Sequence, residues 1–509
     1  MRLHESVLCA TAPVASGSGA GTLSLHDIQN GTSLASWKQT SSNVHCTTTV
    51  QSRDGQGGFM LAAQRDKSIL HVYHFQKDQL ALKIVLPEKL AALAADPSGK
   101  YCAGATTQGR IFLWEVASGI MFNSWDAHYR SITVMCFSQD AAALIAGSED
   151  SGVSVWSIAR LVDNVLQDEL PTPYCAFTDH TLPVTHIVCG VGSFPKCRIL
   201  TASTDNTVKM WDPASKTLLT TFYFPQPIAH VVLDPTERMF FAASSDGSIH
   251  QVNLFRQRED KFSRVAIEAV GGAGISDVIR VNEPGSASTK RRLISVGEPV
   301  SAMTLSLTSS ILLVGTTTGL IHMYDVASHQ LLRTLSTHKG MAITYLTTML
   351  RPPDLIGHIS LSLGPAGNGS KESIPVRPVA PFQRIRDAKA REAHEVTMML
   401  PQTKTTPNAF FSYSSAELIN DHAFFVQPPS TADATPGVAL QSRVTELEGE
   451  VARLKEQLGK AKGINDVMWE SVVQRLVAES KDQSNGADED VAMTTNNGQE
   501  GRRRKRNRT

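Results

Sequence analysis

The sequence predicts an all-β fold, a seven-bladed β-propeller, with a C-terminal α-helical coiled-coil extension. A strand motif recurs about seven times within residues 1–350, and an apolar heptad pattern follows near the C-terminus. The clearest copy of the motif is TASTDNTVKMWD at Thr201–Asp212. Its turn carboxylate, its alternating strand and its closing Trp-Asp are typical of the third strand of a WD-repeat blade. Residues 1–350 are therefore predicted to form a WD-repeat propeller.

The composition agrees with a large globular protein and narrows the classes of function. Of the 509 residues, 41% are hydrophobic and 19% are charged, which is ordinary for a chain with a sizeable core. Lys+Arg and Asp+Glu both total 48, so the net charge indicates no particular partner. No apolar run approaches the ~20 residues of a membrane span, and we expect no membrane partner. The seven cysteines form no C-x-x-C pair, which favours reduced thiols in the cytosol or nucleus.

The residue at the Trp position of each third strand can be followed along the chain. These positions are His26, Tyr73, Trp114, Trp156, Trp211, Val252 and Tyr324. Successive steps are 47, 41, 42, 55, 41 and 72 residues. The short steps match the ~40–45-residue period of WD repeats. The two long steps predict insertions. The first is a short rim helix after Trp156, with Ile158, Leu161, Val162, Val165 and Leu166 at helical spacing. The second, after Val252, is polar and locally basic; its Gly/Ser part is expected to be a solvated loop, and contact with RNA phosphates is the alternative role for its basic triplet Lys290–Arg292.

Two blades carry a set of residues that resembles the hydrogen-bond network of WD repeats. In that network a His at the blade entrance, a turn Asp, a Ser or Thr and the Trp bond to one another inside the blade. The matching residues are His128, Asp150 and Trp156 in one blade and His180, Asp205 and Trp211 in the next. A metal ligand or a general base is the alternative for either His. We predict the structural role, because each His recurs at a blade entrance and the repeats show no convergent polar set in the channel.

The first blade is predicted to close the ring. Residues before Val44 supply only three strands, and the segment Ala342–Leu350 after His338 is the remaining candidate for a fourth. We therefore expect it to return to the first blade, which removes two open sheet edges.

Three segments resemble one family of WD-repeat proteins beyond the generic motif. They are SEDSGVSVWSIARLVD (Ser148–Asp163), RILTASTDNTVKMWDPASKTLLTTF (Arg198–Phe222) and FPQPIAHVVLDPTERMFFAASSDGSIHQVNLF (Phe224–Phe255). The family is the pre-rRNA-processing one whose fungal member is called Ipi three and whose animal member is WD-repeat-containing protein 18. The resemblance implies a non-enzymatic subunit of a nuclear complex. Its implied partners are subunits of the Rix one and Ipi one kind, the large ribosomal subunit precursor and a large AAA ATPase.

The predicted domains are the propeller (1–350), an irregular, partly disordered linker (351–436), a coiled-coil helix (437–480) and a disordered acidic-then-basic tail (481–509). In the linker, Arg384–Leu400 is a candidate short basic helix, and the pieces NAFFSY and HAFFVQ are candidate docking anchors.

The C-terminal helix carries an unbroken heptad seam. Its members are Leu440, Val444, Leu447, Val451, Leu454 and Leu458. A narrow seam of this kind favours pairing with another helix over docking on the propeller. The seam is equally compatible with a homodimer and with a hetero-oligomer formed with a different subunit. A second helical stretch is expected after Gly459–Gly463.

The tail ends in a dense basic cluster, namely Arg502, Arg503, Arg504, Lys505, Arg506 and Arg508. We expect a nuclear import signal, and direct contact with rRNA phosphates is compatible with it.

The sequence favours a scaffold over an enzyme. It has no Walker-type G-x-x-x-x-G-K-[ST], no H-E-x-x-H and no G-x-S-x-G motif. No catalytic residue, cofactor or metal is therefore expected. Together with the family resemblance, this implies a scaffold in pre-rRNA spacer processing and large-subunit precursor assembly in the nucleus. The alternative is a WD-repeat adaptor in a nuclear chromatin or ubiquitin-ligase complex.

Overall fold

The protein was analysed as a computed structural model. It describes residues 4–14, 20–51, 58–163, 169–259, 265–269, 277–281, 293–352, 355, 377–396 and 436–489. The chain divides into two compact units, Met1–Gln402 and Thr403–Thr509.

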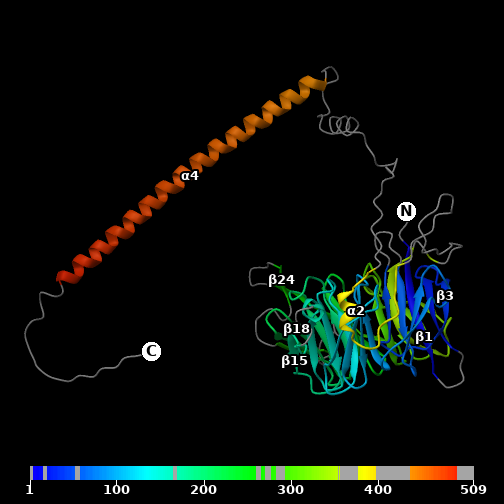
Figure 1. The fold of residues 1–509 in the computed structure, drawn as a ribbon. Helices are drawn as coiled ribbons and strands as arrows, with labels where there is room; N and C mark the ends of the chain where they lie inside the picture. The colour runs from blue at the N-terminus through cyan, green and yellow to red at the C-terminus, as the bar shows by residue number, and fades with distance from the viewer. Residues whose placement is uncertain are drawn as a thin grey trace, which may run out of the picture. The chain divides into compact units, whose positions relative to one another are not determined.

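Seven sheets of four or five strands, antiparallel except for one added strand, form the blades of a propeller in the first unit (Figure 1). The first blade contains β31 (Met341–Leu350), β1 (Glu5–Pro13), β2 (Gly21–Asp27) and β3 (Ser33–Thr40). The second contains β4 (Thr47–Val50), β5 (Phe59–Ala63), β6 (Ile69–His74) and β7 (Leu82–Val85). The third contains β8 (Leu90–Ala95), β9 (Tyr101–Thr106), β10 (Arg110–Glu115) and β11 (Met121–Asp126). The fourth contains β12 (Ile132–Phe137), β13 (Ala143–Ser148), β14 (Val153–Ser157) and β15 (Cys175–Phe177).

Blades five to seven repeat the pattern. The fifth contains β16 (Val184–Cys189), β17 (Ile199–Ser203), β18 (Thr207–Asp212), β19 (Thr217–Tyr223) and an added β25 (Asp277–Arg280). The sixth contains β20 (Ile228–Leu233), β21 (Met239–Ser244), β22 (Ser248–Asn253) and β26 (Leu293–Ser295). The seventh contains β27 (Val300–Leu305), β28 (Ile311–Thr316), β29 (Ile321–Asp325) and β30 (Leu331–Leu335). All seven Trp-position residues lie on third strands, so the predicted blade register is confirmed.

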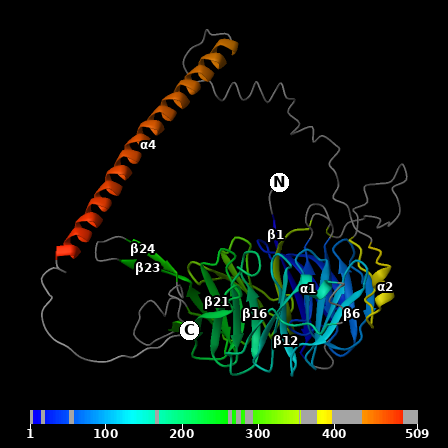
Figure 2. The ribbon, with the colours of Figure 1, turned by 60° about the vertical axis from the view of Figure 1, so that its left-hand side comes forward.

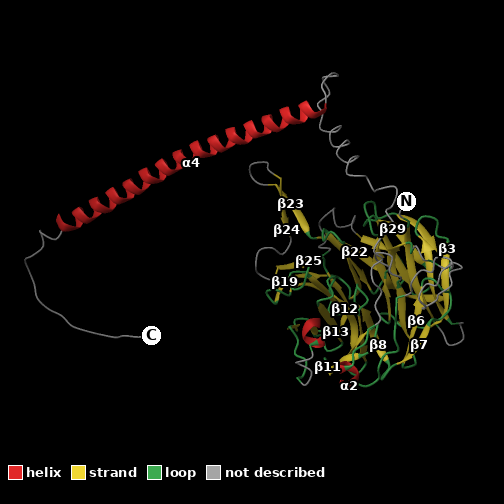
Figure 3. Cartoon of the chain, turned by 45° about the horizontal axis from the view of Figure 1, so that its top comes forward, coloured by secondary structure: helices red, strands yellow, loops and turns green. Residues whose placement is uncertain are grey.

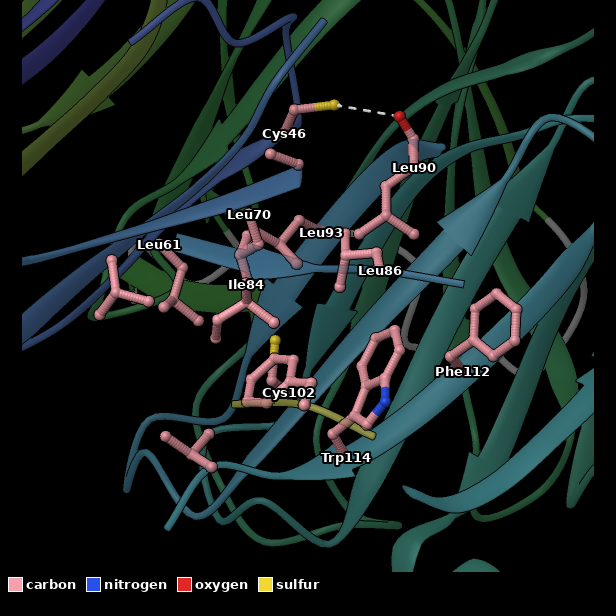
Figure 4. Packing of buried hydrophobic residues seen from close by; sticks show 14 of the residues in the cluster. Cys46, Leu61, Leu70, Ile84, Leu86, Leu90, Leu93, Cys102, Phe112 and Trp114 are labelled. Atoms are coloured by element: carbon pink, nitrogen blue, oxygen red, sulfur yellow. Dashed lines mark hydrogen bonds between the residues drawn. The ribbon is translucent and has the colours of Figure 1, made fainter. Parts of the chain in front are cut away.

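The propeller core lies between neighbouring blades. Most blade strands bury one or both faces, so apolar side chains of one blade pack on those of the next. Figure 4 shows the cluster between the second and third blades, to which the second blade contributes Leu61 and Leu70 and the third contributes Leu93 and Cys102. Hydroxyl groups also tie innermost strands together. At β-bulges, Thr133 donates to the carbonyl oxygen of Val184 over 2.5 Å, and Thr185 donates to that of Ile228 over 2.7 Å.

The ring closes as the sequence predicted. Strand β31 pairs antiparallel with β1 from Glu5↔Leu350 to Pro13↔Met341, with one bulge. The innermost strand of the first blade therefore comes from the far end of the propeller sequence. This pairing covers the inner edge of β1, which then has a neighbouring strand on both sides.

The two insertions have different outcomes. Helix α1 (Ile158–Val162) lies between β14 and β15 and buries Ile158 and Leu161, which confirms the predicted rim helix. Its expected members Val165 and Leu166 lie outside the described residues. The second insertion, predicted to be polar, contains the β23 (Phe255–Glu259) and β24 (Val265–Ala269) hairpin, which projects from the propeller (Figure 2). It also supplies β25, which extends the fifth blade by pairing parallel with β19. Strands β23 and β24 pair with each other, whereas β25 is stabilised by the available edge of β19. The expected Gly/Ser part and Lys290–Arg292 lie outside the described residues.

Part of the predicted linker instead packs on the third blade as a strap (residues 377–396). Phe382 is 4% exposed and stacks on Trp114 with ring centroids 5.2 Å apart. The Trp114 Nε1–H donates to the carbonyl oxygen of Gln383 over 2.9 Å. Figure 3 shows α2 (Ala388–Glu392) beside β11, where Arg391 donates to the carbonyl oxygen of Phe122 over 3.1 Å. Helix α2 is shorter than the expected Arg384–Leu400, and NAFFSY and HAFFVQ lie outside the described residues.

The second unit contains α4 (Pro436–Glu489), a single helix of 54 residues. The sequence predicted two stretches separated at Gly459–Gly463, but both glycines are helical. A glycine costs about 1 kcal/mol in a helix interior, and the Leu, Glu, Gln, Lys and Ala around it favour the helix. None of the helices within the described residues is long and apolar enough to cross a membrane.

Candidate functional site

The fifth blade holds a complete chain of buried hydrogen bonds. His180 lies in the turn before β16, Thr201 on β17, Asp205 in the β17–β18 turn and Trp211 on β18. The Trp211 Nε1–H donates to Thr201 Oγ1 over 2.8 Å, and Thr201 Oγ1 lies 2.8 Å from His180 Nε2. His180 Nδ1 lies 2.8 Å from Asp205 Oδ2. Since Thr201 accepts from the indole, it donates to Nε2, and Nδ1–H donates to the carboxylate. The network joins four segments of the blade.

The charge of Asp205 is stabilised by its neighbours. Burial raises the pKa of Asp205, but the hydrogen bonds from His180 and from the Thr207 hydroxyl outweigh it and lower this pKa from 3.8 to about 2. Because the folded pKa lies below the unfolded one, the carboxylate stabilises the fold above pH 3.8. This contribution is lost as the pH falls toward 2.

The fourth blade holds only part of the same network. His128 Nδ1 lies 3.0 Å from Asp150 Oδ2, and the His128 ring meets Trp156 edge-on at 6.0 Å. Among the described residues, neither Trp156 Nε1 nor His128 Nε2 has a hydrogen-bond partner. Strand pairing gives the reason. Trp211 pairs with Ile199, two residues before Thr201, whereas Trp156 pairs with Leu144, two residues before Ala146. Ala146 thus replaces the bridging hydroxyl with a methyl group.

Replacing Ala146 with Ser should therefore stabilise the protein. The new hydroxyl would accept from Trp156 and donate to His128, so we expect a gain of about 0.5–1.5 kcal/mol in the free energy of unfolding. Urea unfolding of wild type and Ala146→Ser measures it. The control is the same substitution in a Trp156→Phe background, where the indole N–H is missing and the gain should shrink. A gain that persists there in full would contradict the bridging role.

In the first blade, a cysteine and two histidines occupy the positions of the hydrogen-bond network of the fifth blade. Strand register places Cys9 at the position of Thr201 and His26 at that of Trp211, while His338 precedes β31 as His180 precedes β16. The two Nε2 atoms of His26 and His338 lie 2.8 Å apart, and Cys9 Sγ lies 3.4 Å from His338 Nε2. Burial raises the pKa of Cys9 to about 12 and lowers that of His26 to about 4. These groups are neutral at pH 7 and bond to one another.

A second histidine cluster lies in the central channel and was missed by the sequence analysis. We define the channel triad as His45, in the turn before β4, His186 on β16 and His230 on β20. One nitrogen from each side chain lies within 4.8 Å of the other two. The triad lines a cavity of about 300 Å³. The expectation that no polar set converges on the channel is therefore wrong.

Part of this triad left a signal in the sequence. The innermost strands VTHIV and IAHVV carry His186 and His230 at the same position after a β-bulge. This match indicates that both side chains point the same way from neighbouring blades. His45 comes from an irregular turn of the second blade, and strand periodicity gives no sign of its direction.

The heptad seam lies along α4, and its side chains are described from Val444 onward. Val444, Leu447, Val451 and Leu454 are 47–56% exposed, and Leu458 is 73% exposed. Leu440 lies on the helix, but its side chain is outside the described residues. So are the tail residues Arg502, Arg503, Arg504, Lys505, Arg506 and Arg508.

Comparison with known proteins agrees with this architecture. The family "WD domain, G-beta repeat" matches residues 120–157, which contain β11 to β14, and residues 171–212, which contain β15 to β18. The chain is 32% identical over 508 residues to "Pre-rRNA-processing protein IPI3" of Mycosarcoma maydis, covering 82% of this chain and 86% of that protein. It is 26% identical over 447 residues to the protein of the same name from Yarrowia lipolytica, covering 87% and 95%. It is 32% identical over 307 residues to "WD repeat-containing protein 18" of Homo sapiens, covering 59% and 64%. The chain therefore belongs to the family of the pre-rRNA-processing protein IPI3, as its propeller motifs had indicated.

Proposed function

We propose that this protein is a non-enzymatic scaffold subunit that acts in pre-rRNA processing during assembly of the large ribosomal subunit precursor in the nucleus. The observation that carries the proposal is its relation to proteins named for pre-rRNA processing, which covers 82% and 87% of this chain in two fungal relatives. The internal spacer of the precursor is the expected processing substrate of the assembly.

The blade histidines support a scaffold role. In the fifth blade the His, the Thr, the Asp and the Trp are all engaged with one another and are nearly inaccessible. A general base must reach the proton that it abstracts from a substrate. His180, at 3% exposure, stabilises a blade and lacks such access. The propeller is thus a rigid platform whose faces are available to partners.

The tail and the helix supply the remaining functions of the proposal. The helix would join the protein to an oligomeric partner, and the basic tail would direct nuclear import and approach rRNA phosphates. The proposed partners are subunits of the Rix one and Ipi one kind, the precursor particle and a large AAA ATPase.

Charge on the seam should lower the mass of the assembly. In the proposed pairing, the exposed apolar side chains on one stripe of α4 are buried against another helix, and two aspartates would be desolvated there without partners. We expect Leu447→Asp with Leu454→Asp to reduce the mass measured by light scattering. The matched control is Thr445→Asp with Ala452→Asp, which adds the same charge at the same spacing on another face. Equal masses for seam variant and wild type would contradict pairing.

The proposed function is tested by affinity purification of the tagged full-length protein, with mass spectrometry and RNA blotting of the bound material. We expect Rix-type subunits together with rRNA that still contains the internal spacer. Recovery of histones or a cullin module without rRNA precursors would overturn the proposal in favour of an adaptor in a chromatin or ubiquitin-ligase complex.

A further inference from the structure

The channel triad brings together three imidazoles from the second, fifth and sixth blades. His186 and His230 stand on innermost strands, and His45 reaches inward from a turn. The ring centroids lie 5.2 Å apart for His45 and His186, 5.5 Å for His186 and His230, and 6.0 Å for His45 and His230. The three rings thus surround one point of the channel.

This spacing is close to that of imidazoles around a tetrahedral metal ion. A Zn–N bond of about 2.0–2.1 Å puts neighbouring ligand nitrogens about 3.4 Å apart and ring centres about 5 Å apart. The triad's nitrogens lie within 4.8 Å of one another. Side-chain rotations that move each ring by roughly 1 Å would bring the three nitrogens from their present separation to the separation that a zinc ion requires.

One ring nitrogen of the triad is free to act as a metal ligand. Among the described residues, the buried Nδ1 of His186 has no hydrogen-bond partner. Leaving such a group unsatisfied costs about 1–3 kcal/mol, and a bound ion would remove this cost. Burial lowers the pKa of His45 to about 4 and that of His230 to about 3, and burial with the neighbouring imidazoles lowers the pKa of His186 well below its usual range. All three rings are therefore neutral at pH 7, the form that binds metals.

The backbone also holds the triad in place. His45 has a φ of +62°, a left-handed conformation that is unusual for a residue other than glycine. A hydrogen bond with the backbone of Thr185 opposes the effect of burial on the pKa of His45. A metal-binding imidazole characteristically uses its second nitrogen for such a bond, which fixes the orientation of the ring.

We propose that His45, His186 and His230 bind one divalent transition-metal ion of the zinc class in the central channel. Three neutral imidazoles suit zinc, cobalt, nickel and copper rather than magnesium or calcium, which prefer oxygen ligands. Three protein ligands leave a fourth position of a tetrahedral ion open, and the 300 Å³ cavity has room there for water or a partner's side chain. The ion would also link three blades across the channel.

The cluster of Cys9, His26 and His338 is the competing site in the same protein. Its side chains already bond to one another at 2.8 and 3.4 Å in place of a blade network, so their arrangement is explained without an ion. It would supply a thiolate, whereas the channel triad supplies only nitrogen. This difference separates the two sites spectroscopically.

The test uses the full-length protein without a histidine tag, treated with a chelator and then titrated with Zn²⁺ against a chromogenic competitor. We expect one equivalent to bind and to raise the melting temperature. His186→Ala and the more conservative His230→Asn should each weaken binding at least about 100-fold, because losing an outer-shell partner alone costs roughly 10–100-fold. His322→Ala, on the third strand of the seventh blade, is the matched control and should bind as wild type does.

Titration with Co²⁺ identifies the ligands. The channel triad predicts the visible absorption of a tetrahedral cobalt site without a thiolate-to-metal charge-transfer band, and Cys9→Ser should leave it unchanged. Failure of the wild type to bind either metal would overturn the proposal. So would binding that survives both triad substitutions, or binding that Cys9→Ser abolishes. Circular dichroism of each metal-free variant separates loss of the site from loss of the fold.

Discussion

A chain that ends at Gly340 should fail to form a stable propeller, because it lacks β31. Strand β31 buries Ile343, Leu346 and Met349, which are 0–7% exposed, and pairs with β1 along nine residues. Burial of each of these side chains contributes about 1.5–3 kcal/mol, so their loss approaches the 5–15 kcal/mol that stabilises a typical domain. We expect no cooperative thermal transition by circular dichroism, and aggregation on a sizing column through the open edge of β1.

The control is a chain that ends at Gln402, the end of the first compact unit. It keeps β31 and the strap, and it should melt at the wild-type temperature. A second variant, Leu346→Asp in the full-length protein, places a charge at the same junction without removing backbone. A chain ending at Gly340 that melted like the longer one would show that ring closure contributes little.

Trp211→Ala should destabilise the propeller by about 3–5 kcal/mol, the range for truncating a large buried aromatic side chain. Trp211 is 1% exposed, stacks on Phe177 at 4.4 Å and donates to Thr201. Its removal leaves a cavity between the fourth and fifth blades, and Thr201 Oγ1 loses the hydrogen bond that it accepts from the indole N–H. Thermal melting and urea unfolding of the full-length protein measure the effect.

A tryptophan on the helix provides the comparison. Trp469 on α4 is 62% exposed, so Trp469→Ala should leave the propeller transition unchanged. If Trp211→Ala melted at the wild-type temperature, the assignment of Trp211 to the core of its blade would be contradicted.

The repeating parts of the fold could be predicted from the sequence because each blade is a local unit. Asp205 and Trp211 stand within seven residues of each other, and a tight turn with an alternating strand fixes their relation. The return of β31 was also predictable, since the first blade lacked one strand. Local periodicity thus determined the number of blades, their register and the short helix α1.

Elements that depend on a distant partner could not be predicted in this way. The part of the strap before α2 forms no strand or helix of its own, and Phe382 is held by stacking on the ring of Trp114 in the third blade. Strand β25 forms because the edge of β19 is available for parallel pairing. Neither signal exists in the segment itself, because the stabilising contact comes from residues far away in the sequence.

The candidate sites also differ in whether the local repeat or the tertiary structure places their residues. The sequence by itself determined the blade positions of His128, His180 and their turn aspartates, since these recur with the repeat. Only the tertiary structure decided that Ala146 interrupts one network, and that His45, His186 and His230 meet in the channel. The physical reason is that closing a ring of seven blades brings residues from non-adjacent repeats together at its centre, where no periodicity along the chain relates them.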